Sequence, residues 1–158
     1  MSGARTQIFV SYSHADGDWL KRLQVHLKPL ERAGSIEWWD DTKILPGMVW
    51  RDEIEKALNA AAIGVLLVSA DFMATDYCWE IEMKRAMERH EKKEARVIPI
   101  IIRDCKWDTA PFAKLNGLPR KGKPIDLWTK KDTAWREVAE GIEKVAKELR
   151  KKKKAQAE

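Results

Sequence analysis

Short apolar runs divide this chain at regular intervals. Four of them have the length and the β-branched content of buried strands: residues 7–12 (QIFVSY), 35–39 (SIEWW), 63–69 (IGVLLVS) and 96–102 (RVIPIII). A shorter run at residues 124–128 (PIDLW) begins with proline, which has no N–H to donate, and this position is typical of an edge strand. The pattern therefore predicts five strands.

Helical patterns lie between these runs. One helix follows the polar turn at residues 13–18, and others are predicted at residues 50–62, 76–90 and 133–152. Strands that alternate with helices predict a parallel sheet covered on both faces. We therefore expect an α/β, flavodoxin-like three-layer fold with a five-stranded parallel sheet in the order 2-1-3-4-5. Ligands of such sheets bind beyond the carboxyl ends of the strands where the order reverses, here between the first and third strands.

Length and composition agree with a single soluble domain. The 158 residues are enough for one self-sufficient core, expected at residues 5–150, with a basic tail at 151–158 that is a solvated helix end or a linker to another domain. Apolar runs are too short to cross a membrane and the first residues do not resemble a signal peptide, so we expect a cytoplasmic protein. Cys78 and Cys105 are too far apart for a metal knuckle, and we expect no metal.

The net charge of +5 is concentrated at one end of the chain. Residues 150–158 (RKKKKAQAE) carry five positive charges and one negative charge, which leaves the rest of the chain close to neutral. A nucleic-acid-binding domain carries a basic face within its fold. We therefore expect no nucleic-acid partner.

The first crevice loop excludes several occupants of this fold. Its sequence, SYSHADGD, has a single glycine where a dinucleotide-binding domain needs G-x-G-x-x-G, and no Walker loop occurs elsewhere. A phosphoacceptor receiver domain needs acidic residues at the strand ends, where this chain has Ser11 and Ser69. A Ser/His nucleophile pair drawn from Ser11, Ser13 and His14 has no nucleophile elbow to support it.

Four segments, in order and with their spacing, resemble the TIR (Toll/interleukin-1 receptor) domain family in its bacterial form. They are IFVSYSHAD at 8–16, WWDDTKILPG at 38–47 followed by WRDEIEKAL, LLVSADFMATDYCWEIEM at 66–83, and VIPIIIRDCKW at 97–107. The resemblance implies a flavodoxin-like fold, which agrees with the strand order expected from periodicity. It also implies one of two activities: cleavage of NAD+ with release of nicotinamide, or assembly without turnover.

Members of this family that cleave NAD+ use one glutamate early in the third helix. The match to an aromatic-Cys element at Tyr77-Cys78 makes Glu82 the expected catalytic acid, with Glu80 as the alternative. At about 100° per residue, Trp79 heads the apolar stripe of this helix, and Glu82 and Glu80 flank it at about 60° and about 100° on opposite sides. Periodicity alone therefore does not choose between the two glutamates.

The same resemblance suggests which residues bind substrate and which mediate assembly. Side chains near the crevice are expected to contact the rings, ribose or phosphates of NAD+, which is a substrate here and not a cofactor: Phe9, Ser11, His14, Trp39, Tyr77 and Trp79. The loop at 40–49 is expected to bind other TIR domains through these residues: Asp41, Lys43, Leu45, Pro46 and Gly47. Two other functions stay open, a non-catalytic TIR interaction module and a nucleoside deoxyribosyltransferase-like enzyme of related fold.

Overall fold

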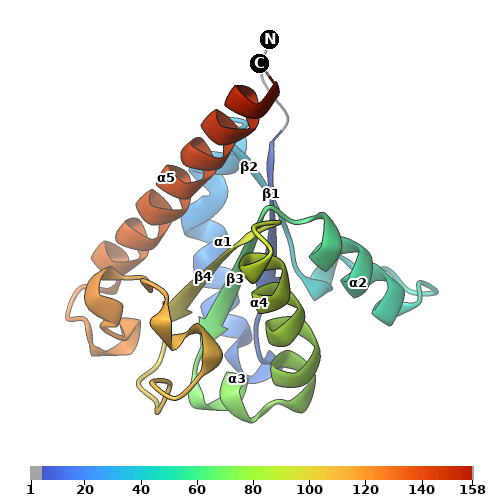
Figure 1. Cartoon of the computed structure of the whole chain (residues 1–158). Coiled ribbons are helices and arrows are strands. Elements are labelled where there is room, and N and C mark those ends of the chain that lie inside the picture. The colour runs from blue at the N-terminus through green and yellow to red at the C-terminus, as the bar shows by residue number, and fades with distance from the viewer. Residues whose placement is uncertain (1–4, 158) are drawn as a thin grey trace.

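A parallel sheet forms the centre of the computed structural model, which describes residues 5–157. Its strands are β1 (Thr6–Ser11), β2 (Ile36–Trp39), β3 (Ile63–Val68) and β4 (Arg96–Ile101), in the order β2-β1-β3-β4 (Figure 1). All neighbouring pairs run parallel, so the carboxyl ends of the strands lie at one edge of the sheet. The expected α/β fold and the order of its first four strands are confirmed.

Helices cover both faces of this sheet. α1 (Gly17–Arg32) and α5 (Lys131–Ala157) pack on one face, where Leu23, Leu27 and Trp135 are almost completely buried. α2 (Trp50–Ala60), α3 (Ala70–Ala74) and α4 (Lys84–Glu91) pack on the other. Alternate residues of the strands point to opposite faces, and both sets are apolar, as expected of strands buried on two sides.

The expected fifth strand is absent from the part of the chain that the structure describes. Its residues form a short 3-10 turn at Ile125–Leu127. The outer edge of β4 has few backbone groups left to pair: Pro99 has no N–H, and the N–H of Val97 donates to His90 Nδ1 at 3.0 Å. Among residues 5–157, Leu118 alone makes a bridge to this edge, and its N–H donates to Pro99 O at 2.9 Å. A full strand cannot form against an edge that is already capped in this way.

The predicted basic tail continues the last helix. α5 extends to Ala157, and the side chains of residues 151–156 are exposed. A helical, solvated end is one of the two forms expected for this segment. None of the described helices is long and apolar enough to cross a membrane.

Candidate functional site

The carboxyl edge of the sheet between β1 and β3, where the sequence predicts the ligand crevice, gathers side chains from four segments. Ser11 is the last residue of β1 and pairs with Leu66 of β3, so its side chain lies at the carboxyl edge of the sheet. A 3-10 turn at His14–Asp16 follows β1, and a second one at Asp41–Lys43 follows β2. The turn at Cys78–Met83, which follows α3, reaches the same edge, where Glu82 accepts a hydrogen bond from Ser11.

A π-helical turn carries the two candidate glutamates. It spans Cys78–Met83 and joins α4 directly, and its wider turn places Cys78, Glu82 and Met83 all on the buried side. Glu80 lies on the exposed side, where its carboxylate accepts a hydrogen bond from Lys84 Nζ at 2.7 Å. π turns are uncommon and occur mostly at functional sites. The change of helical phase places Glu82 against the sheet and leaves Glu80 in solvent.

Glu82 is a buried carboxylate held by one hydroxyl group. It is 7% exposed, and Ser11 Oγ donates to its Oε1 at 2.5 Å. Burial raises the pKa of Glu82 from 4.5 to about 7, the hydrogen bond from Ser11 opposes this change, and the charges of Asp41 and His14 respectively raise and lower the value. The carboxylate is therefore close to half ionised at neutral pH, a property typical of catalytic acids and bases.

Asp41 links the loop after β2 to the end of β1. The Tyr12 hydroxyl donates to Asp41 Oδ1 at 2.6 Å, and His14 Nε2 lies 2.5 Å from Asp41 Oδ2. Burial, followed by the bond to Asp41, raises the pKa of Tyr12 above its usual range. Tyr12 did not stand out in the sequence, because nothing distinguishes it from an ordinary aromatic residue at a strand end.

A second network crosses the same edge of the sheet. Asp16 is 1% exposed, accepts a hydrogen bond from Ser69 Oγ at 2.5 Å, and lies 2.7 Å from an Arg103 nitrogen. Arg103 also reaches Asp71 Oδ2 at 2.5 Å. The hydrogen bond from Ser69 ties the turn after β1 to the end of β3, and the partly buried ion pair with Arg103 ties it to the end of β4. The side chain of Asp16 therefore holds these loops together and does not cap α1, since it makes no hydrogen bond to the first turn of that helix.

The aromatic residues near the crevice are not equally accessible. Phe9 is 1% exposed and stacks on Trp39 with 5.4 Å between ring centroids. It therefore packs against Trp39 and is not accessible to a ligand. Tyr77 meets the exposed Trp50 edge-on at 5.0 Å, and Trp79 packs against the buried Phe112 at 6.5 Å. Trp39, Tyr77 and Trp79 are half-buried.

The loop at 40–49 combines a fixed base with an exposed apolar tip. Asp40 is fully buried and accepts hydrogen bonds from Thr42 N at 3.0 Å and from Gln24 Nε2 at 2.9 Å. Four apolar side chains that follow are 46–61% exposed: Leu45, Met48, Val49 and Trp50. Gly47 has a positive φ of 89°, a conformation that favours glycine, so the turn at Pro46-Gly47 follows its expected chemistry.

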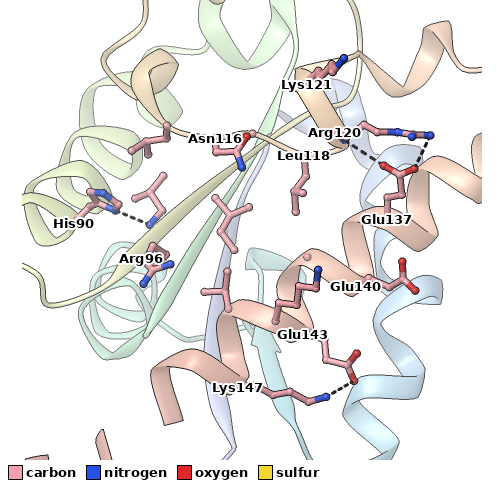
Figure 2. A pocket seen from close by; sticks show the side chains of 17 residues that line it. His90, Arg96, Asn116, Leu118, Arg120, Lys121, Glu137, Glu140, Glu143 and Lys147 are labelled. Atoms are coloured by element: carbon pink, nitrogen blue, oxygen red, sulfur yellow. Dashed lines mark hydrogen bonds and ion pairs between the residues drawn. The ribbon is translucent and has the colours of Figure 1, made fainter. Parts of the chain in front are cut away.

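The described part of the chain has two hollows. The smaller lies near the candidate site and the larger lies away from it. The smaller, of about 370 Å³, lies between α2 and the π turn and is lined by residues that include Arg51, Tyr77 and Ile81. The larger, of about 840 Å³, lies along the outer edge of β4 against α5, and His90 and the Arg120–Glu137 ion pair are among the groups that line it (Figure 2). Of the expected site residues, Tyr77 lines the smaller hollow and none lines the larger.

Comparison with known proteins gives one family and two curated relatives. A family model described as TIR domain matches residues 8–151. The uncharacterised protein y4lF of Sinorhizobium fredii (strain NBRC 101917 / NGR234) is 50% identical over 139 residues, which cover 88% of this chain and 43% of that protein. The NAD(+) hydrolase PdTIR of Paracoccus denitrificans (strain Pd 1222) is 26% identical over 107 residues, 67% of this chain and 34% of that protein. The chain spans less than half the length of either relative.

Solved TIR structures share the fold. The TIR domain of the Toll-related receptor TRR-2 from Hydra magnipapillata has a TM-score of 0.60 at 22% identity, covering 85% of this chain and 96% of that one. The TIR domains of the activated Roq1 resistosome have a TM-score of 0.52 at 20% identity, covering 89% and 84%. At these identities the likeness concerns the fold alone. The family model covers most of the sequence, and the chain belongs to the TIR domain family.

Proposed function

We propose that this TIR domain cleaves NAD+ at the bond between ribose and nicotinamide, giving nicotinamide and either linear ADP-ribose, when water attacks the ribose, or cyclic ADP-ribose, when the adenine of the same molecule attacks it. The observation that carries the proposal is the Glu82 carboxylate, buried at the carboxyl edge of the sheet and held by Ser11. The relative from Paracoccus denitrificans, which is named as an NAD(+) hydrolase, supports the same reaction.

One carboxylate is enough for this chemistry. Nicotinamide carries a positive charge in NAD+ and leaves as a neutral molecule, so no acid has to protonate it, whereas ordinary glycoside hydrolysis requires a pair of carboxylates. Positive charge grows on the ribose as the bond breaks. A fixed carboxylate in a site with little water stabilises that charge by about 3–4 kcal/mol. Glu82 has the burial and the position for this role.

The surrounding side chains suit a dinucleotide. Trp39 at the end of β2 and Tyr77 at the start of the π turn are half-buried aromatic residues, and rings of this kind stack on flat bases. Arg51 lies at the hollow beside Tyr77, where a guanidinium group favours an anionic phosphate. Ser11 hydrogen-bonds Glu82 and holds its carboxylate in one orientation.

Ionisation of Glu82 predicts the pH dependence of this reaction. Only the charged carboxylate stabilises a cationic transition state, so kcat/KM is expected to rise with pH through about 7, the pKa of Glu82. Ser11→Ala removes a hydrogen bond that favours the charged form, and a bond of this kind contributes about 1.5–3 kcal/mol. The midpoint of the Ser11→Ala profile is therefore expected about one pH unit or more higher. Initial rates of nicotinamide release between pH 5.5 and 9 measure both profiles, and an unmoved midpoint in Ser11→Ala would contradict the assignment.

The exposed apolar tip of the loop at 40–49 favours self-association as part of this function. Several exposed apolar side chains in one loop are typical of a protein contact. Leu45→Asp is expected to abolish any rise of specific activity with protein concentration, because a charge at the tip opposes burial against a second copy. Leu127→Asp is the matched control, since Leu127 is 53% exposed and Leu45 is 61% exposed. Sedimentation together with nicotinamide release over a range of protein concentrations measures the effect.

One assay separates the three candidate functions. Concentrated protein is incubated with NAD+ and with nucleosides, and the free bases are measured. Nicotinamide release supports the proposed hydrolase. No release from NAD+, even under crowding or induced clustering, favours an interaction module built on the exposed loop. Release from nucleosides and not from NAD+ favours the deoxyribosyltransferase-like enzyme.

A further inference from the structure

Both oxygens of the Asp41 carboxylate are engaged by residues just beyond β1. Oδ1 accepts the hydroxyl hydrogen of Tyr12 at 2.6 Å, and Oδ2 lies 2.5 Å from His14 Nε2. Tyr12 is 8% exposed and fixes the carboxylate from the protein side. His14 lies on the solvent side, with 76% of its side chain exposed.

This contact sets the orientation of the His14 ring. An ionised carboxylate only accepts hydrogen bonds, so Nε2 carries the hydrogen and Nδ1 of the neutral ring carries the lone pair. Among residues 5–157, no group donates to this nitrogen. A histidine held by an aspartate at one nitrogen and open at the other has the arrangement of a general base, because the aspartate stabilises the imidazolium ion that forms.

The charges of Asp41 and His14 are close enough to influence Glu82, the candidate catalytic acid. The charges of both Asp41 and His14 act on Glu82, and Glu82 and Asp41 both act on the Tyr12 hydroxyl. Glu82 is itself engaged by Ser11 and faces the sheet, whereas His14 faces solvent. Two different tasks are therefore available to two different groups, one buried and one exposed, at the same edge of the sheet.

We propose that His14, oriented by Asp41, is the general base that activates the attacking water. This inference rests on the proposed hydrolase function. The C1′–N1 bond breaks with its electron pair passing to nicotinamide, which leaves neutral. The water oxygen bonds to C1′, and one of its protons passes to His14 Nδ1 and then to solvent. Asp41 is a positioning residue in this step, and Glu82 stabilises the charge on the ribose.

A general base is needed only when the attacking nucleophile has a proton to lose, so changing the nucleophile tests this role of His14. A pyridine such as 3-acetylpyridine attacks C1′ through a nitrogen lone pair and has no proton to lose, so base exchange needs no general base, whereas hydrolysis does. His14→Gln is therefore expected to lower hydrolysis of NAD+ by about 100-fold. Base exchange is expected to change far less, so the ratio of exchange to hydrolysis rises. Asp41→Asn is expected to move the ratio in the same direction.

Azide gives a second measurement that does not depend on pyridine exchange. It is an anion without a proton, and with His14→Ala it is expected to restore nicotinamide release with formation of the azido sugar. His26→Gln serves as the control, because His26 lies on α1 and stacks on Trp135 of α5, and makes no contact with Asp41. Thermal unfolding shows whether each variant is folded.

Each remaining outcome counts against the general-base role of His14 or against the proposed hydrolase function on which that role rests. Equal losses of hydrolysis and exchange in His14→Gln would assign His14 to binding or structure, as a contact to substrate phosphate predicts. Unchanged hydrolysis, or no rescue by azide of a folded but inactive His14→Ala, would exclude the general base. If the wild-type protein shows neither hydrolysis nor exchange, the proposed hydrolase function itself fails.

Discussion

Glu82→Gln is expected to slow nicotinamide release from NAD+ by about 100- to 1000-fold at pH 8. The amide keeps the shape of the side chain and the contact with Ser11, but it has no charge to place opposite the cationic ribose. The loss is expected in kcat and kcat/KM alike, because the interaction exists mainly in the transition state. Steady-state rates at saturating and low NAD+ measure both constants.

The neighbouring glutamate provides the matched control. Glu80 is two residues away on the same π turn, but it is exposed and paired with Lys84. Glu80→Gln is therefore expected to leave the rate nearly unchanged. Full activity in Glu82→Gln, or an equal loss in both variants, would rule out the assignment of Glu82.

The same substitution is expected to stabilise the protein at alkaline pH. Because the pKa of Glu82 is raised from 4.5 to about 7 in the folded chain, the folded state binds more protons than the unfolded state between these values. The free energy of unfolding therefore falls as the pH rises through this window, and the fall is absent in Glu82→Gln. Relative to wild type, the variant is expected to gain about 2–3 kcal/mol between pH 5 and pH 8.

Urea unfolding of both proteins at the two pH values measures this gain. Any pH-independent effect of the amide cancels, since only the change between pH 5 and pH 8 is compared. Glu80→Gln is again the control and is expected to show no such gain, because Glu80 is exposed. A constant difference in stability across pH would mean that Glu82 is not a buried, titrating group.

The strands were predictable because burial on two faces leaves a clear pattern. Continuous apolar runs located β1, β3 and β4, and alternation with helices gave their parallel order. The short run at 124–128 has the same local composition but forms a turn. Its fate depends on the capped edge of β4, where His90 and Leu118 take the available backbone groups. No local pattern in the run reports those distant contacts.

Part of the candidate site could not be predicted, because it is formed by contacts between residues far apart in the sequence. Ser11 and Glu82 are 71 residues apart, and Asp16 and Arg103 are 87 residues apart, so no spacing in the sequence reveals either pair. Helical periodicity did not choose between Glu82 and Glu80 for a different reason. An ideal helix places both beside the apolar stripe, and only the π turn moves Glu82 inward.

The sealed edge of β4 also constrains how copies of this domain can come together. Crowded domains with open sheet edges tend to join backbone to backbone, which leads to irreversible aggregation. Pro99, the His90 contact to Val97 and the single bridge through Leu118 block that route along β4. An assembly of this domain therefore cannot extend the sheet past β4 by backbone pairing, and any contact made at this edge has to be made by side chains.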